Sequence, residues 1–334
     1  MPQLRQNIIT GEWVVIAPAR SKRPDDYIRA QKREVKDELA SACVFCLNGS
    51  EFKRRLKNFD NKHTWTIQNK FPAFACDEKE CSDRTRSYYP EHQFYRAKAA
   101  VGEHDVIVVK DHETTLPKFT TQIWSDLIET IQLRMIEHHR NEVVNHIMPI
   151  YNHGPEAGAS VAHPHAQIFS GPVIPNIINR ELDGSQRYFE NNGVCVFCDM
   201  TRHEKTEKLR LVAENDHFIA FTFFAARFPF EIWILPKKHQ SNFERLSRTQ
   251  RQALSEIMQN IFKRLDKLLA NPSLNWWIHS LPTILDNSDS YHWHIEIAPR
   301  LTGYGGFEMG SGMVIDIQDP EESAEYLRKT KTTS

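Results

Sequence analysis

One ordered set of cysteines and histidines occurs twice in this chain. The first copy consists of Cys43, Cys46, His112, His163 and His165, and the second of Cys195, Cys198, His239, His292 and His294. Thiolates and imidazoles are zinc ligands, and a neutral imidazole is also a nucleophile near pH 7. The repeat therefore predicts metal sites, a candidate nucleophile and an internal duplication.

Four of the six cysteines form two CxxC pairs, Cys43-Val-Phe-Cys46 and Cys195-Val-Phe-Cys198. In a reducing compartment such a pair either binds zinc or cycles as a redox dithiol, and the redox alternative expects a single pair beside a βαβ pattern. Because both pairs are followed by matching histidines, we favour zinc. Cys76 and Cys81 lie in a polar stretch, where we expect unpaired loop thiols.

Composition limits the possible functions. The 334 residues are 40% hydrophobic and 25% charged, which allows one long domain or two closely packed lobes. Because 42 Lys and Arg nearly balance 43 Asp and Glu, the chain offers no overall field for nucleic acid. The first residues lack the apolar run of a signal peptide, and no stretch reaches the roughly 18 apolar residues of a membrane helix. We therefore expect a cytoplasmic protein with neither nucleic-acid nor membrane partners.

The first half of the chain alternates β-prone runs with one long amphipathic stretch. Residues 7–17 predict a hairpin that turns at Thr10-Gly11, and 106–109 predict a strand that ends just before His112. Residues 120–147 have helical spacing of apolar side chains, and residues 148–151 and 166–170 predict two further strands.

The second half repeats this order with different residues. Strands are predicted at 217–224 and 231–235, followed by a loop that bears His239. A long helix is predicted at 247–269, and strands at 276–280 and 292–298. The repeated order indicates duplication, and it predicts antiparallel hairpins with helices on one side, hence the α+β class.

The two HxH segments need strands to position them. In a regular strand, residues two apart share a face, so both imidazoles would point the same way. Pro164 confines the first segment to an edge, a strand start or a bulge, which would splay His163 and His165 apart. A splayed pair can divide its work between one metal ligand and one free base.

Three segments carry a resemblance to a known family. Residues 17–24, 112–117 and 154–167, the last containing His-Pro-His-x-Gln, resemble the galactose-1-phosphate uridylyltransferase family of the histidine-triad superfamily. The likeness runs from about Asn7 to about Gly312. It implies two histidine-triad-like lobes, 1–172 with the catalytic His-Pro-His and 173–334 with a degenerate site. Their expected architecture is a mainly antiparallel sheet flanked by helices.

The resemblance also implies an activity, which is transfer of a nucleoside monophosphate through a covalent nucleotidyl-histidine. It makes His165 the nucleophile and Gln167 a hydrogen-bond donor to the transferred phosphate. The residues matching nucleotide or phosphate contacts are Arg20, Arg23, Asn152 and Ser160. Those matching ligands of two zinc ions are Cys43, Cys46, His112 and His163, then Cys195, Cys198, His239 and His292. The family further implies a homodimer.

Departures from the family pattern affect both the second site and the substrate. Trp293 and Glu296 stand in the second half where the first has Pro164 and Gln167, so we expect His294 to be catalytically silent. The segment 303–313 lacks the Lys and Gln of enterobacterial uridylyltransferases and is similar to the ADP-glucose phosphorylase branch.

Three functions therefore remain open. The first is uridylyl transfer between UDP-glucose and a hexose 1-phosphate such as galactose 1-phosphate. The second is adenylyl transfer from ADP-glucose to phosphate. A non-enzymatic, zinc-stabilised nucleotide-binding module is the third.

Overall fold

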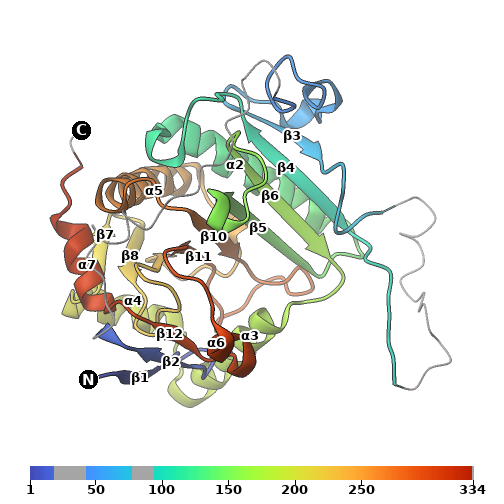
Figure 1. Cartoon of the computed structure of the whole chain (residues 1–334). Coiled ribbons are helices and arrows are strands. Elements are labelled where there is room, and N and C mark those ends of the chain that lie inside the picture. Colours follow the sequence, from blue (N-terminus) through green and yellow to red (C-terminus); the bar gives the residue numbers. More distant parts are fainter. Residues whose placement is uncertain (19–42, 77–93, 333–334) are drawn as a thin grey trace.

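One nine-stranded sheet organises the chain (Figure 1). The computed structural model describes residues 1–18, 43–76 and 94–332. All neighbouring strands of this sheet pair antiparallel, which confirms the predicted α+β class. Its order is β3 (Thr64–Gln68), β4 (Glu103–Val109), β6 (His165–Gly171), β5 (His146–His153), β10 (Leu274–His279), β11 (His294–Pro299), β9 (Ile232–Pro236), β8 (Phe218–Thr222) and β7 (Leu211–Glu214).

The two halves of the chain meet at the pairing of β5 with β10. Outward from this joint, β6 and β4 follow on one side, and β11 and β9 follow on the other. Asn152 lies opposite Asn275 in the joint, and the Asn275 amide donates to Asn152 Oδ1 at 2.8 Å. The duplication that the sequence indicates therefore produces one continuous sheet.

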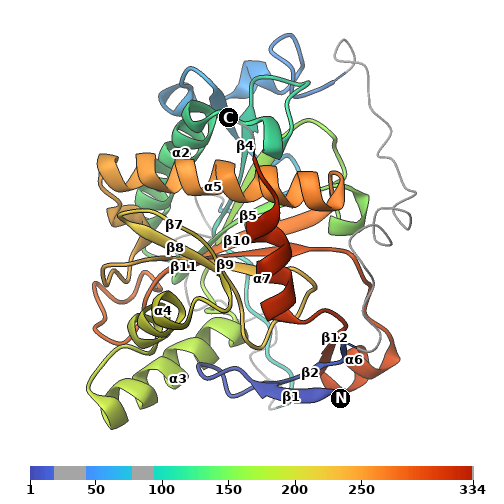
Figure 2. The same ribbon diagram turned by 90° about the vertical axis from the view of Figure 1, so that its left-hand side faces the viewer.

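Two long helices cover one face of the sheet (Figure 2). They are α2 (Thr121–His139) and α5 (Arg248–Leu269), and they begin after Thr120 and Ser247. Each of these hydroxyls accepts a hydrogen bond from a main-chain N–H of the first turn, which stabilises the helix start. Trp124 of α2 stacks on Phe262 of α5 with ring centroids 5.1 Å apart. This aromatic contact lies within the main hydrophobic core, between the helices and the sheet.

The opposite face is covered differently in the two halves. In the second half it lies under α3 (Asn176–Asn192) and α4 (Val196–Glu207), and Phe197 of α4 is fully buried there. In the first half, Phe45 and Phe52 pack on that face against Trp65 and its neighbours. Helices therefore lie on both faces, so the expectation of helices on one side is wrong.

The predicted N-terminal hairpin is present. β1 (Gln3–Gln6) pairs antiparallel with β2 (Trp13–Ile16), and Gly11 adopts a positive φ of 76° in the connection. β12 (Val314–Asp316) adds to β2 in parallel and completes a separate three-stranded sheet. A segment near the C-terminal end of the described chain therefore lies beside the N-terminal hairpin.

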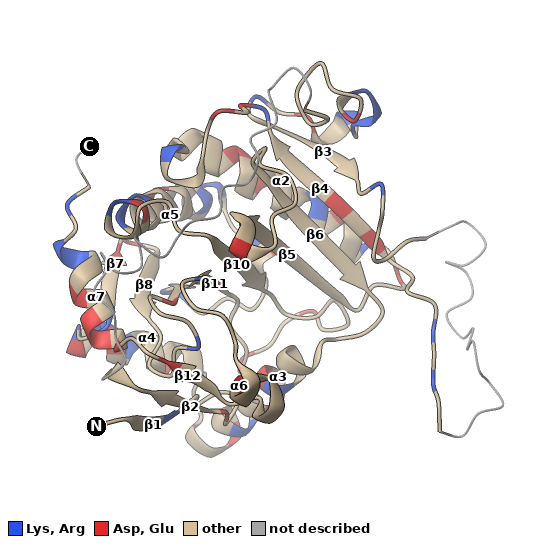
Figure 3. Cartoon of the chain, in the orientation of Figure 1, with Lys and Arg blue, Asp and Glu red and all other residues tan. Residues whose placement is uncertain are grey.

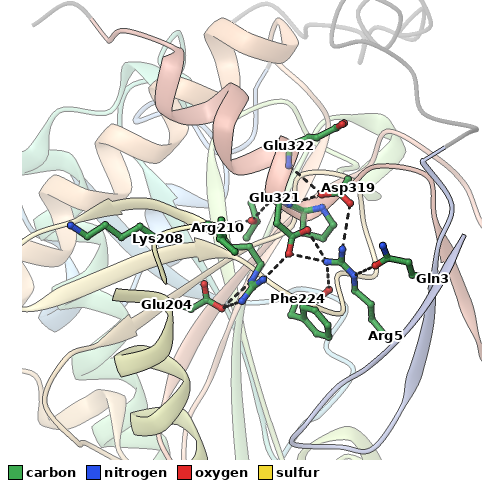
Figure 4. Close-up of polar contacts among 12 residues, drawn as sticks. Gln3, Arg5, Glu204, Lys208, Arg210, Phe224, Asp319, Glu321 and Glu322 are labelled. Carbon is green, nitrogen blue, oxygen red and sulfur yellow. Dashed lines mark hydrogen bonds and ion pairs between the residues drawn. The ribbon is translucent and has the colours of Figure 1, made fainter. Parts of the chain in front are cut away.

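A buried ion-pair network fastens that small sheet to the rest (Figure 4). Arg5 of β1 pairs with Glu321 at 2.8 Å, and Arg210 pairs with Glu204 and Glu321, both at 2.6 Å. Both guanidinium groups also lie over the ring of Phe224. Glu321 belongs to the C-terminal helix α7 (Pro320–Lys329), so this network links the N-terminal hairpin and α7 to α4.

The remaining elements are short. The helices are α6 (Gly306–Ser311) and α7 (Pro320–Lys329), and the single-turn 3-10 helices are Phe52–Arg54, Lys57–Phe59, Leu116–Lys118, Pro155–Ala157 and Phe243–Arg245. Figure 3 shows Lys and Arg interspersed with Asp and Glu along α5 and α7, in keeping with the net charge of -1. Among the helices of the described chain, none is both long and apolar enough to cross a membrane.

Candidate active site and metal sites

The structure brings the first cysteine and histidine set together. The ligand atoms of Cys43, Cys46, His112 and His163 all lie within 4.8 Å of one another. Cys43 Sγ is 3.5 Å from His163 Nδ1, and Cys46 Sγ is 3.3 Å from His112 Nδ1. A tetrahedral zinc ion places its sulfur and nitrogen ligands about 3.6 Å apart. These four residues could therefore hold one metal ion.

A main-chain carbonyl selects the ligand atom of His163. His163 Nε2 donates to the carbonyl oxygen of Val109 at 2.6 Å, which leaves the Nδ1 lone pair for a metal. Val109 ends β4, the strand that leads toward His112. The metal group thus connects the end of β4 to the start of β6.

The second set forms an equivalent group. The ligand atoms of Cys195, Cys198, His239 and His292 also lie within 4.8 Å of one another. Cys198 Sγ is 3.4 Å from His239 Nδ1 and 3.7 Å from His292 Nδ1. His239 Nε2 donates to the carbonyl oxygen of Ser288 at 2.9 Å, so Nδ1 is again the free ligand atom. Both expected metal sites are therefore geometrically assembled.

His165 begins β6, while His163 lies just before the strand. His165 Nδ1 donates to the carbonyl oxygen of His163 at 2.8 Å, so its Nε2 keeps the lone pair of a neutral ring. The Phe45 ring lies 5.5 Å from the imidazole between centroids. Burial lowers the pKa of His165, which favours the neutral, nucleophilic form. The two histidines of this segment thus present their free nitrogens to different surroundings.

Polar side chains surround His165 on the same face of the sheet. Gln167 follows it by two residues, so both side chains project from one face of β6. Asn152 continues that face on β5, where Tyr151 lies opposite Ala166. Ser160 is exposed in the loop between the two strands.

The loop before His163 contains a glycine that the fold requires. Gly154 has φ of 79°, and a Cβ at this position would lie 2.2 Å from Ser273 Oγ. A side chain here would therefore be strained and would also clash. This requirement fixes how the chain leaves β5 and approaches the histidine pair.

Arg20 and Arg23, two of the predicted phosphate-binding residues, lie outside the described residues. Cys76 is disulfide-bonded, so the expectation of an unpaired thiol there is wrong. Cys81 also lies outside the described part of the chain.

In the second half, a network of charged side chains stands where the first half has the neutral side chains of Gln167 and Asn152. His294 begins β11 as His165 begins β6, but its Nε2 lies 3.3 Å from Glu296 Oε1. Glu296 pairs with Arg227, which also pairs with Glu231 at 3.1 Å. Trp233 stacks on the His294 ring, with the centroids 4.6 Å apart and the planes 14° apart. His294 Nε2, the equivalent of the free Nε2 of His165, therefore faces the Glu296 carboxylate, and the Trp233 indole covers the His294 ring.

A second pair of side chains completes this buried network. His279 Nδ1 lies 3.0 Å from Glu181 Oε1 and 3.4 Å from Glu296 Oε1. Burial would lower the pKa of His279, but Glu181 and Glu296 raise it above its usual value. Burial would raise the pKa of Glu296, but Arg227 and His279 bring it to about 2. The network is thus held together by compensating charges.

Sequence reasoning did not identify the functional surroundings formed by His104, Glu181, Arg227, Glu231, Trp233 and His279. Strand register shows which residues of the two halves occupy equivalent positions. Val106 lies opposite Gln167, and Trp233 lies opposite Glu296. His104 stands eight residues before His112, as Glu231 stands eight before His239. That equal spacing was a usable signal. The counterpart of Asn152 is His279, but a longer loop in the second half hides this equivalence in the sequence.

Comparisons with known families cover nearly the whole chain. The family model described as galactose-1-phosphate uridyl transferase, N-terminal domain, matches residues 1–175, and the C-terminal domain model matches residues 181–321. ADP-glucose phosphorylase of Arabidopsis thaliana is 32% identical over 99% of this chain and 94% of its own length. Galactose-1-phosphate uridylyltransferase of Thermotoga maritima is 28% identical over 99% of both chains.

A solved structure shares the complete fold. The crystal structure of an Arabidopsis thaliana ADP-glucose phosphorylase with bound ADP-glucose superposes with a TM-score of 0.83 and 29% sequence identity. The similarity covers 100% of both chains.

Proposed function

The chain belongs to the galactose-1-phosphate uridyl transferase family, and from this premise we propose that it is a nucleotidyltransferase whose nucleophile is His165. One observation carries the proposal. His165 donates from Nδ1 to the His163 carbonyl, and none of the described residues hydrogen-bonds to its Nε2. The ring is therefore held with its nucleophilic atom available for substrate.

In the first step, His165 Nε2 attacks the α-phosphorus of a nucleotide sugar. The new N–P bond forms as the bond between this phosphorus and the bridging oxygen breaks, and hexose 1-phosphate leaves with the electron pair. The ring becomes cationic, and the Nδ1 hydrogen bond to the His163 carbonyl stabilises that charge. Gln167 donates to the phosphoryl oxygens, where charge develops.

In the second step, an oxygen of a phosphorylated acceptor attacks the same phosphorus. The N–P bond breaks, and its electron pair returns to His165. Asn152 and Ser160, together with Arg20 and Arg23, are proposed to bind nucleotide or phosphate oxygens in both steps. The reaction is transfer if the acceptor attacks the nucleotidyl-histidine and water is kept away from it, and hydrolysis if water attacks instead.

We propose that both cysteine and histidine groups hold zinc. Each offers four protein ligands, the number that closes a structural tetrahedral site. When bound, zinc would cross-link the loops around each histidine pair. In the first half this would fix His163, and through the Nδ1 hydrogen bond to its carbonyl also the ring of His165.

The proposed donor is ADP-glucose and the proposed acceptor is phosphate. The identity to the plant phosphorylase is higher than to the bacterial uridylyltransferase, and 303–313 lacks Lys and Gln. UDP-glucose with galactose 1-phosphate is the second candidate, because the uridylyltransferase relative covers the chain equally well.

A matrix of donors and acceptors tests these proposals. Purified protein would be incubated with ADP-glucose or UDP-glucose, alone or with phosphate or galactose 1-phosphate. ADP formed from ADP-glucose and phosphate supports phosphorolysis, whereas UDP-galactose supports uridylyl transfer. Nucleoside monophosphate formed without acceptor would identify hydrolysis. Tight nucleotide binding without turnover or nucleotidyl-enzyme would instead support a binding module.

A homodimer and a cytoplasmic location are proposed from the family resemblance. Light scattering of the zinc-loaded protein tests the first, since it predicts twice the chain mass of 39.0 kDa. Fractionation of the source cells tests the second.

A further inference from the structure

His104 is a buried imidazole on the same face as the proposed active site. It lies on β4 opposite Phe169 of β6, and the two rings stack with centroids 3.9 Å apart. Only 6% of the residue is exposed. It is neither a proposed metal ligand nor a proposed substrate contact.

A main-chain hydrogen bond selects the tautomer of His104. The N–H of Ala73 donates to His104 Nδ1 at 3.2 Å. Burial lowers the pKa of His104, so the ring is neutral near pH 7 and carries its hydrogen on Nε2. That nitrogen lies 3.0 Å from Gln167 Oε1. His104 is therefore the donor and the Gln167 carbonyl is the acceptor.

Asn69 also approaches this nitrogen. Its Nδ2 lies 3.2 Å from His104 Nε2, and its Oδ1 accepts from the N–H of Phe71. A hydrogen bond from Asn69 would require the other tautomer, which would set the Ala73 N–H against a second N–H. The side-chain amide can rotate whereas the main-chain N–H cannot, so the Ala73 contact decides the tautomer.

The consequence falls on Gln167. With Oε1 held by His104, the amide can turn only its amino group toward substrate, and no described residue hydrogen-bonds to Gln167 Nε2. A carbonyl turned to the phosphate would repel it, whereas an amino group donates. We propose that His104 is a positioning residue that orients the Gln167 amide so that its amino group faces the transferred phosphate. This inference rests on the proposed nucleotidyl transfer.

The second half supports the assignment independently. Glu231, the counterpart of His104, shares Arg227 with Glu296, the counterpart of Gln167. His104 thus contacts Gln167 in the first half, and Glu231 is bridged to Glu296 in the second. His104 and Glu231 each stand eight residues before a metal-ligand histidine. The register is retained, although the interaction has changed from a neutral hydrogen bond to an ion-pair bridge.

Matched substitutions test the role of the Nε2 donor. Glutamine can place an amide nitrogen near the position of Nε2, whereas asparagine reaches only the position of Nδ1. Hexose 1-phosphate release would be measured in a single turnover with the donor that the parent uses. We expect His104→Asn to slow this step about 10- to 100-fold, with the donor concentration that gives half of the maximal rate nearly unchanged. His104→Gln should stay within about threefold of the parent rate. Equal rates for both variants would overturn the inference.

A double-mutant cycle separates positioning from a structural role. His104→Phe keeps a ring to stack on Phe169 but removes the donor. If His104 acts through Gln167, His104→Phe should slow the parent about 10- to 100-fold and change a Gln167→Ala protein less than about threefold. An equal slowing in both backgrounds would contradict the inference. Thermal unfolding would confirm that each variant is folded, and the Asn and Gln pair decides the test if the Phe variant is not.

The parent protein provides the reference that separates two failures. If the parent forms no nucleotidyl-enzyme with either donor, the proposed function is wrong, and the inference about Gln167 is wrong with it. If the parent reacts and His104→Asn reacts as fast, only the inference about His104 is wrong.

Discussion

The two halves place the same imidazole in contrasting surroundings. His165 and His294 each begin a strand and each donate from Nδ1 to the carbonyl of the histidine two residues earlier, at 2.8 and 3.2 Å. Beyond this shared frame, His165 has Gln167 beside it and Val106 opposite that glutamine. His294 has Glu296 against its Nε2 and Trp233 stacked on its ring.

We propose from this contrast that the repeated frame keeps its scaffold in both halves and its chemistry only in the first. The metal groups, the strand register and the helix over the sheet are common to both halves. In the second half, however, Glu296 stands where the first half has Gln167, and Arg227 and His279 compensate its charge. A carboxylate in this place would repel a phosphate, whereas removing it would leave Arg227 and His279 without a compensating charge.

The largest effect should separate the two histidines themselves. His165→Asn should lower the single-turnover rate at least about 1000-fold, because it removes the nucleophile, while His294→Asn should change the rate little. Rapid-quench measurement of hexose 1-phosphate release checks this, with circular dichroism as the folding control. A comparable loss in both variants would remove the distinction between the halves.

Exchanging the amide and the carboxylate should have the next largest effect. Gln167→Glu should slow nucleotidyl transfer about 100- to 1000-fold, because it replaces a phosphate donor with a negative charge. The same assay checks this rate.

The reciprocal change, Glu296→Gln, should leave the rate nearly unchanged and lower the unfolding free energy by roughly 3 kcal/mol, because it breaks a buried ion pair. Denaturant unfolding measures that loss. For the first exchange, a Gln167→Glu protein that transfers the nucleotidyl group as fast as the parent would refute the assigned role of Gln167.

Removing a metal ligand from each half should distinguish scaffold from site. Cys43→Ser and Cys195→Ser should each reduce bound zinc from about two ions per chain to about one and lower the unfolding temperature. Only Cys43→Ser should also slow the folded protein strongly, since His163 contributes both to that metal group and to holding His165. Atomic absorption and calorimetry give the first two values. Unchanged zinc in either variant would exclude that site.

The smallest predicted effect concerns pH and the second half alone. The pKa of His279 is raised above 6.5, so its contribution to stability is fully present below pH 6.5 and is lost as pH rises through the raised value. The charged or titratable groups around it are Glu181 on α3, Glu296 and His294 on β11, His146 on β5 and Arg227 in the loop before β9.

The variant His279→Gln isolates the contribution of protonated His279 to stability. The unfolding temperature of His279→Gln should fall furthest below that of the parent near pH 6, and the difference should shrink by pH 9. Calorimetry at both pH values measures it. A difference that grows with pH would show the opposite linkage.

Much of the frame was predictable because local patterns determine it. The spacing of apolar residues located both long helices, and Ser247 marks the start of α5 as a cap. The predicted helix at 120–147 ends earlier, at His139, because local periodicity alone does not define where the chain turns toward β5. The repeated CxxC and HxH segments likewise indicated metal groups, since their residue types and order are local signals.

The contents of the second site were not predictable from such patterns. Arg227 and Glu181 meet Glu296 only because α3 and a loop fold over one face of the sheet. The spacing of His104 from His112 is its only sequence signal, and that spacing does not point to its partner Gln167, which is 63 residues away. Strand register created these contacts, and register follows from the complete sheet.

Mapping the covalent intermediate tests the central proposal most directly. The parent would be mixed with ADP-glucose, and separately with UDP-glucose, each labelled at the α-phosphorus. It would then be digested at neutral or alkaline pH, which preserves phosphoramidates, for peptide mass spectrometry. The account predicts one nucleoside monophosphate per chain on His165, with release of the label on addition of acceptor. Label on His294, or a parent that turns over substrate without any labelled histidine, would contradict it.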